Sequence, residues 1–166
     1  MYTIEEFDEQ KTRIMKYIVY KRRTEKEVRD KFKNSMEEEI LNDIIEYLKD
    51  AKYIDDNDYL RRMVQNIMIL KTQSIKEIQY KLLSKGIKKD EIERYIYINE
   101  EELEEYELNC AKKIILKKSD KDENEIRAYL IRKGYKLENI RKAIDEINQK
   151  WKEKLNVNFS ITNRKI

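Results

Sequence analysis

The chain has 166 residues, of which 43% are charged and 40% hydrophobic, and its formal net charge is +3. The hydrophobic share suffices for a core, so wholesale disorder is not expected. The charged share exceeds the roughly 25% of an average globular protein and favours a thin shape with much surface. A net charge this small does not by itself indicate non-specific binding to nucleic acid.

The residue inventory excludes several classes of protein. There is no proline and only two glycines, which disfavours the tight turns of an all-β fold and leaves an all-α fold. With no histidine and the single cysteine Cys110, an intrachain disulfide, Cys/His zinc sites and Ser-His or Cys-His catalysis are excluded. We therefore expect a protein that is not an enzyme and has no cofactor or metal.

The same inventory predicts a compartment. A free thiol and the absence of a signal peptide indicate a reducing, cytoplasmic setting. No run approaches the roughly 20 apolar residues that a membrane span needs. We expect no membrane contact.

The first segment, residues 1–9, alternates apolar and polar positions at Tyr2, Ile4 and Phe7 and is interpreted as a short strand or a lead-in. A helix is expected next, because apolar residues then recur at helical spacing. Its apolar positions are Ile14, Tyr17 and Ile18.

A capping box begins the second predicted helix. Thr24 can accept from free N–H groups of the first turn, and Glu27 can return a bond to the N–H of the cap. The pattern returns at Ser74 and at Asp122, at intervals of about 50 residues, which indicates an internal repeat. Apolar pairs on one face follow each cap: Val28 and Phe32, Ile78 and Leu82, Ile126 and Leu130.

Glycines predict where two of these helices end. Gly86 and Gly134 follow basic last turns at Lys85 and Lys133, and glycine adopts the positive φ of a helix C-terminus without steric cost. The first copy has Asn34 in this region, and we expect this asparagine to take the left-handed conformation.

A third helix follows each stop, and a longer helix precedes each capping box. The third helices have Ile40, Ile44 and Leu48, then Ile92 and Ile96, then Ile140, Ile144 and Ile147 on one face. The longer helices of the second and third copies have as apolar positions Leu60, Met63, Val64, Ile67 and Leu70, and Leu103, Tyr106, Cys110 and Ile114.

These elements predict nine helices in three tandem three-helix repeats. The expected boundaries are 1–9 for the lead-in, 10–54, 55–99 and 100–150 for the repeats, and 151–166 for a C-terminal tail. Units this small bury their faces by stacking, so we expect an elongated, curved array. In the tail, Trp151 and Leu155 can extend the last helix, whereas residues 156–161 lack a helical period and are interpreted as loose.

Several charged segments admit two interpretations. Residues 55–58 are an acidic cluster that we interpret as helix caps in preference to a metal site. A calcium loop counted from Asp120 fails, because Glu125 and Ile131 stand where glycine and glutamate are required. The acidic start and lysine-rich end of the helix over residues 100–118 fit a solvated helix with a complementary dipole, or a lysine end that meets an acidic partner. Cys110 is interpreted as buried.

Basic residues recur beside the predicted caps and stops. Any one of them is ordinary solvated surface, but their repetition on a repeat scaffold indicates a periodic contact surface. Such a surface would suit a filament or a nucleic-acid backbone. The candidate contact residues are Arg22, Arg23, Arg61, Arg62, Lys85, Arg127, Arg132 and Lys133.

Three segments resemble the RecX family of recombination regulators. Residues 51–59 are similar to the family's Gly-Tyr-(Leu/Ile)-Asp-Asp junction, with Lys52 in place of glycine. Residues 74–87 and 126–135 resemble its helices closed by a basic residue, glycine and an apolar or aromatic residue. Further departures are the missing glycine near Met36 and residues 71–73, where the family often has a glycine-bearing turn.

The resemblance implies a partner, which is the filament that the recombinase RecA forms on single-stranded DNA. RecX proteins lie in the groove of that filament and oppose its growth or favour its disassembly, and the candidate residues could also touch the DNA directly. Two alternatives stay open: a nucleic-acid-binding repeat protein that acts without RecA, and a protein scaffold that acts elsewhere. We expect a monomer.

Overall fold

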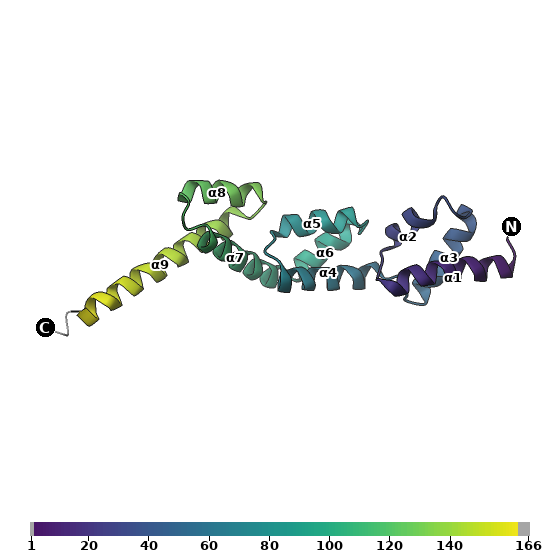
Figure 1. Cartoon of the computed structure of the whole chain (residues 1–166), viewed down its shortest axis with the longest axis horizontal. Helices are drawn as coiled ribbons and strands as arrows, with labels where there is room; N and C mark the ends of the chain where they lie inside the picture. The colour runs from purple at the N-terminus through teal and green to yellow at the C-terminus, as the bar shows by residue number, and fades with distance from the viewer. Residues whose placement is uncertain (1, 163–166) are drawn as a thin grey trace. The chain divides into compact units, whose positions relative to one another are not determined.

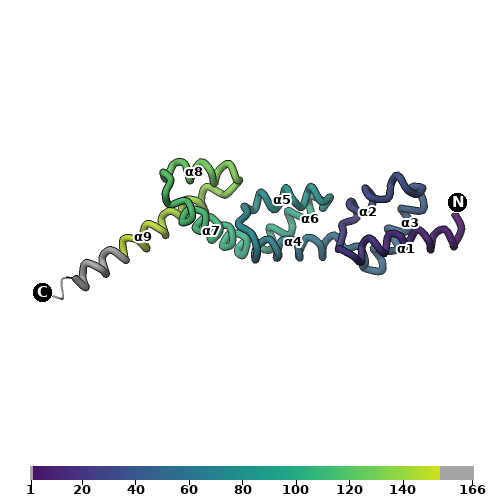
Figure 2. Tube along the Cα trace, in the orientation of Figure 1, coloured from purple at the N-terminus to yellow at the C-terminus, as the bar shows by residue number. Residues whose placement is uncertain are grey.

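The structure, a computed structural model, describes the backbone of residues 2–162 and the surroundings of side chains up to residue 153. This part of the chain contains nine α-helices and no strand, so the predicted all-α class is confirmed (Figures 1 and 2). No helix within it is both long and apolar enough to cross a membrane. The helices are α1 (Ile4–Tyr20), α2 (Glu25–Phe32), α3 (Glu38–Asp50), α4 (Asp56–Leu70), α5 (Ile75–Ser84), α6 (Lys89–Ile98), α7 (Glu100–Lys117), α8 (Glu123–Arg132) and α9 (Leu137–Thr162).

The chain divides into two compact units. Unit 1 comprises Met1–Asn66 with Gln79–Tyr95, and unit 2 comprises Ile67–Ile78 with Ile96–Ile166. The division falls within α4, α5 and α6. The predicted boundaries of the three repeats stay a prediction.

The core of unit 1 lies between α1, α2 and α3. Helix α1 contributes Ile14 and Ile18, as predicted, and α2 contributes Val28 and Phe32. Burial of one such aliphatic side chain stabilises the folded state by about 1.5–3 kcal/mol. The apolar face of α3 supplies the remaining helical core residues, which are Ile40, Leu41, Ile44, Ile45 and Leu48.

In unit 2, α7 packs along α9. The buried side chains of the two helices are Leu103, Tyr106, Cys110 and Ala111 in α7 and Ile140, Ala143 and Ile144 in α9. Cys110 is buried as predicted, and this burial raises the pKa of its thiol. Leu70 was predicted to be a core position of its helix, but it is exposed because it is the last residue of α4.

The N-terminal segment is helical from Ile4 onward, so the interpretation of residues 1–9 as a short strand is wrong, while the lead-in boundary stays a prediction. Thr3 forms a capping box in which its side chain accepts from the N–H of Glu6 and the Glu6 side chain accepts from the N–H of Thr3. These bonds satisfy donors that a helix N-terminus otherwise leaves free. The alternating apolar residues fit a helix too, since Phe7 packs against the core of unit 1.

The C-terminal stretch 156–161 was interpreted as loose, but its backbone belongs to α9. No glycine or proline follows Gly134, so nothing in the sequence stops a helix that has begun at Leu137. The last part of the predicted tail, residues 163–166, lies outside the described residues.

The end of α2 also differs from the prediction. Among the described residues other than glycine, positive φ occurs at Lys52 alone, so Asn34 does not take the left-handed conformation. The N–H and hydroxyl of Ser35 instead donate to the carbonyl oxygen of Phe32 at 2.8 and 3.1 Å, which closes the helix end in a tight turn.

Three other helices end in one shared motif. In α5, Gly86 with φ +86° donates to the carbonyl of Leu83, and the following N–H of Ile87 reaches back to Leu82. Gly134 ends α8 in the same way with φ +83°. Both predicted glycine stops are therefore confirmed. Lys52 ends α3 with φ 62° and the same bonds, although it bears a side chain.

Candidate partner-binding surface

Three candidate arginines of unit 1 surround one carboxylate. Asp58 lies 2.7 Å from Arg22 Nη1, 2.7 Å from Arg62 Nε and 3.7 Å from Arg61 Nη2. The hydrogen bond from Arg62 and the charges of the three arginines hold the pKa of Asp58 below its usual value. More than half of each arginine side chain is exposed. Since Asp58 offsets one of three positive charges, this arginine cluster presents a positive surface.

The other two candidates of unit 1 are tied to Glu27. Lys85 Nζ lies 2.7 Å from Glu27 Oε1, and Arg23 Nη1 lies 3.8 Å from the same oxygen. Arg23 also stacks on Tyr17, with its guanidinium carbon 4.5 Å from the ring centroid. Burial raises the pKa of Glu27, but the bonds from Lys85 and Thr24 outweigh it, so the net shift is downward. These contacts stabilise the fold.

Lys85 belongs to a junction between α2 and the end of α5, which we call the first joint. The buried Thr24 hydroxyl donates to the carbonyl oxygen of Lys85 at 2.7 Å and accepts from the N–H of Glu27 at 3.2 Å. A Cβ on Gly86 would lie 2.4 Å from Lys26 Cβ, so only glycine allows this approach.

The same arrangement occurs in unit 2 and forms the second joint. The buried Ser74 hydroxyl donates to the carbonyl oxygen of Lys133 at 2.6 Å and accepts from the N–H of Glu77. Lys133 Nζ lies 3.1 Å from Glu77 Oε1. A Cβ on Gly134 would lie 3.0 Å from the side chain of Lys76. The capping serine, the lysine and the glycine thus all contribute to the contact between the start of α5 and the end of α8.

At each joint, a carboxylate from another helix of the same unit accepts a hydrogen bond from a backbone N–H. In unit 1, Asp56 Oδ1 accepts from the N–H of Glu25, the first residue of α2, at 2.9 Å. In unit 2, Glu107 Oε1 accepts from the N–H of Ile75, the first residue of α5, at 2.9 Å, and its Oε2 accepts from Lys136 N at 3.1 Å and Asn139 Nδ2 at 2.8 Å. Each carboxylate satisfies backbone donors at a helix start.

Glu107 corrects one interpretation of the sequence. It was grouped with the solvated acidic residues that begin α7, but it is fully buried. The signal was its spacing, because Glu107 lies four residues after Leu103 and four before Ala111, on the buried face of the helix. A glutamate on an apolar stripe indicates a buried carboxylate with specific donors.

The remaining candidates lie in or near α8. Arg127 Nη2 makes an ion pair of 2.9 Å with Glu123 within that helix. Arg132 is exposed, makes no ion pair with the described residues, and lines a cavity of about 350 Å³ beside Lys118 and Tyr129. Five of the eight candidates thus lie in unit 1 and three in unit 2.

Exposed apolar pairs form a second repeated feature, which sequence reasoning missed. Two pairs lie at the C-terminal end of the first helix of a predicted repeat: Val19 and Tyr20 end α1, and Ile69 and Leu70 end α4. Near the end of α7, Leu116 is exposed and its neighbour Ile115 is half-buried. Tyr20 is 88% exposed, Leu70 71% and Leu116 52%. Single exposed apolar residues are common, but clustered and recurring ones are typical of contact sites.

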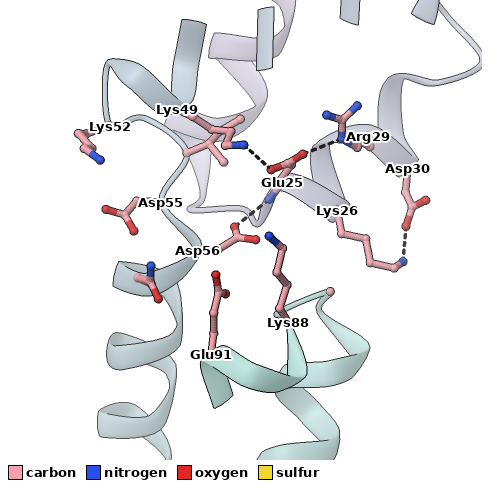
Figure 3. Close-up of a pocket in the computed structure, with 13 residues that line it drawn as sticks. Glu25, Lys26, Arg29, Asp30, Lys49, Lys52, Asp55, Asp56, Lys88 and Glu91 are labelled. Carbon is pink, nitrogen blue, oxygen red and sulfur yellow. Dashed lines mark hydrogen bonds and ion pairs between the residues drawn. The ribbon is translucent and has the colours of Figure 1, made fainter. Parts of the chain in front are cut away.

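A cavity of unit 1 lies beside the first joint and holds about 540 Å³ (Figure 3). Glu25 lies between Lys49 Nζ at 3.1 Å and Arg29 Nε at 2.9 Å, and Lys88 points toward the same space. Five acidic and five basic residues line this cavity. With charges balanced in this way, it favours neither an anion nor a cation.

Comparison with known proteins identifies the family. Models of known protein families give no match to the chain. Regulatory protein RecX of Caldanaerobacter subterraneus subsp. tengcongensis is 31% identical over 144 residues, which cover 84% of this chain and 71% of the relative. The chain belongs to the RecX family. RecX of Clostridium botulinum (strain Alaska E43 / Type E3) is 34% identical over 132 residues, 75% of this chain and 61% of the relative.

Two crystal structures of RecX proteins share the fold. RecX from Lactobacillus salivarius superposes with a TM-score of 0.77 at 24% identity, over 89% of this chain and 99% of that one. A second RecX structure gives a TM-score of 0.74 at 23% identity. The chain spans 61% of the length of the clostridial relative and 58% of RecX from Staphylococcus epidermidis.

In residues 51–59, the segment that most resembles RecX proteins, the acidic side chains make contacts that stabilise helix starts. Asp55 Oδ1 accepts from the N–H of Asp58 at 2.9 Å and so caps α4, while Asp56 serves the start of α2. The expectation that residues 55–58 supply a helix cap is confirmed. Lys52 occupies a left-handed position where the RecX family has glycine.

Proposed function

We propose that this RecX-family chain binds the filament that RecA forms on single-stranded DNA and opposes its growth or favours its disassembly. The observation that carries the proposal is the likeness to several proteins named regulatory protein RecX, over three quarters or more of this chain. A filament presents equivalent sites at regular intervals. A chain whose exposed apolar pairs recur at equivalent helix ends is suited to such a partner.

The proposed contact residues divide into two groups. Arg22, Arg61, Arg62, Arg127 and Arg132 are the members free to meet a partner, since their ion pairs are exposed or absent among the described residues. Arg23, Lys85 and Lys133 are engaged in stacking or in the joints, so their replacement would act through the fold first.

The test is the rate of ATP hydrolysis by the host's RecA on single-stranded DNA. The chain is titrated at ratios to RecA too low to sequester free RecA or coat the DNA. A fall in hydrolysis supports filament modulation. Unchanged hydrolysis, together with salt-sensitive binding of the chain to DNA alone, overturns the proposal in favour of a nucleic-acid-binding protein that acts without RecA.

A triple variant tests the arginine cluster. Arg22→Gln, Arg61→Gln and Arg62→Gln together remove its positive charge without setting further carboxylates beside Asp58. The matched control neutralises Lys33, Lys89 and Lys142, which are also exposed and also pair with a carboxylate in their own or the adjoining turn. The cluster variant is expected to need several-fold more protein for the same inhibition, and the control is not. An equal loss of inhibition in the cluster variant and in the control would show that the effect depends on net charge alone.

The apolar pairs are tested in the same assay. Tyr20→Ser and Leu70→Ser remove exposed apolar surface and should leave the melting temperature nearly unchanged, because neither side chain is buried. Weaker inhibition at unchanged stability would assign the pairs to the partner contact. Full inhibition would remove them from the proposed surface.

A further inference from the structure

Unit 2 contains a second cavity, of about 430 Å³, beside the second joint. It lies between the loop before α5, the end of α7, and α8 with the turn that follows it. Its lysines are Lys117, Lys118, Lys121 and Lys133, and its acids are Glu77 and Asp120. With four ammonium groups against two carboxylates, the lining has an excess of positive charge, unlike the balanced cavity of unit 1.

The charges of this cavity are only partly neutralised. Lys133 pairs with Glu77 in the second joint, and Lys118 lies over the ring of Tyr129 at 4.5 Å from the centroid. Lys121 approaches Glu125 only to 4.0 Å. Lys117 makes no ion pair with the described residues. An anion in the cavity would therefore meet ammonium groups that are not already engaged by strong partners.

The residue Tyr135 also lines this cavity. Tyr135 is 4% exposed, and its hydroxyl is buried without a hydrogen-bond partner among the described residues. Burial raises the pKa of Tyr135 far above its usual range, so the hydroxyl stays protonated and able to donate. Unpaired buried hydroxyls are rare in folded proteins because each costs free energy.

Neighbouring groups do not supply the missing acceptor. Glu77 faces Tyr135, but its Oε1 accepts from Lys133 and its Oε2 from the N–H of Ser74. The nearby hydroxyl of Tyr106 donates to the carbonyl oxygen of Lys71 and accepts from the N–H of Gln73. Tyr135 is therefore the donor of this region that an external acceptor would satisfy.

We propose that this cavity binds a phosphate group, with the Tyr135 hydroxyl and the lysine ammonium groups as donors. Phosphate fits this set because it carries about 1.5–2 negative charges as a monoester and offers several strong acceptor oxygens at once. The exposed Thr72 at the rim supplies a further hydroxyl. The phosphate can belong to a free phosphate compound or to the phosphodiester backbone of a nucleic acid, and both present the same oxygens.

The first arm of the test titrates the full chain with pyrophosphate by isothermal calorimetry in a phosphate-free buffer of low salt. Tyr135→Phe removes only the hydroxyl, and Lys118→Gln removes one cation. Each is expected to weaken binding about tenfold or more, since a hydrogen bond or ion contact to a charged group is lost. Lys113→Gln is the matched control, because Lys113 lies on α7, is exposed and does not line the cavity.

The second arm repeats the comparison with a short single-stranded oligonucleotide, followed by fluorescence anisotropy. Loss of binding in Tyr135→Phe for pyrophosphate alone identifies a free phosphate compound as the ligand. The same loss for the oligonucleotide identifies a phosphodiester. If both cavity variants bind both probes like the unchanged chain, the proposal is overturned.

Stability separates this proposal from a structural role. Without phosphate, Tyr135→Phe should melt no lower than the unchanged chain, because the hydroxyl it lacks has no partner in the protein. A lower melting temperature would reveal such a partner and overturn the proposal. RecA is absent from both arms, so this site and the filament proposal can fail independently.

Discussion

The hydroxyl of Thr24 makes two bonds in the first joint, and their combined contribution can be isolated. Thr24→Val keeps the shape of the side chain, removes the acceptor for Glu27 N and leaves the carbonyl oxygen of Lys85 without its donor. Loss of a helix cap costs about 1 kcal/mol, and a buried polar group left unpaired costs about 1–3 kcal/mol. The expected loss of unfolding free energy is therefore about 2–4 kcal/mol.

Thr3 supplies the control, because it forms the same capping box without a joint. Its side chain accepts from Glu6 N at 3.1 Å, and the residue is exposed. Thr3→Val should cost only the cap, about 1 kcal/mol. The difference between the two variants, measured by urea denaturation with far-ultraviolet circular dichroism, reports the bond to Lys85. If Thr24→Val costs no more than Thr3→Val, the joint does not stabilise the fold.

Three further effects should follow from the same contacts. Gly86→Ala and Gly134→Ala should each lower the unfolding free energy measured by urea denaturation, because an alanine in the left-handed conformation costs about 1–2 kcal/mol. The loss should be larger for Gly86→Ala, since its Cβ would lie 2.4 Å from Lys26 Cβ. Equal losses would contradict this order. Lys52→Gly should raise the urea midpoint, by about 0.5–1 kcal/mol in free energy, whereas Lys52→Ala, which keeps the strain and loses only the charge, should not. Because the pKa of folded Glu27 lies below its unfolded value near 4.5, its stabilisation is complete above that pH and is lost as pH falls through the folded pKa. The stability gap between the unchanged chain and Glu27→Gln should therefore be larger at pH 7 than at pH 3, and a constant gap would refute the assignment.

Features encoded by local spacing were predictable from the sequence. The capping boxes at Thr24 and Ser74 form as predicted, and Asp122 caps α8 by accepting from the N–H of Asn124. Gly86 and Gly134 end their helices at positive φ. In each case the residues that determine the structure lie within one helical turn of one another, so the pattern and its consequence are read together.

Features that join distant segments were not predictable. The hydroxyl that caps α2 also donates to Lys85, which lies 61 residues away, and Glu107 reaches Ile75 across 32 residues. A local pattern shows that Thr24 is a cap but not that its proton has a second acceptor. Lys85 and Lys133 recur in the sequence because the same joint is formed twice. In each joint the lysine pairs with the capping-box glutamate of another helix, so this recurrence does not indicate a contact surface.

This origin of the repetition changes which residues bear on function. Lys85 and Lys133 each make an ion pair within a joint, so a repeated internal contact explains why their charges recur. No such contact explains Arg22, Arg61 and Arg62, because one Asp58 does not need three arginines, and ion pairs made by arginines that are more than half exposed add little stability in water. The exposed apolar pairs that end α1 and α4 likewise contribute little to folding. Binding to a partner best explains residues that recur or cluster but have no role in stability. The proposed RecA-facing surface therefore consists of the arginine cluster and the apolar pairs in preference to the joint lysines.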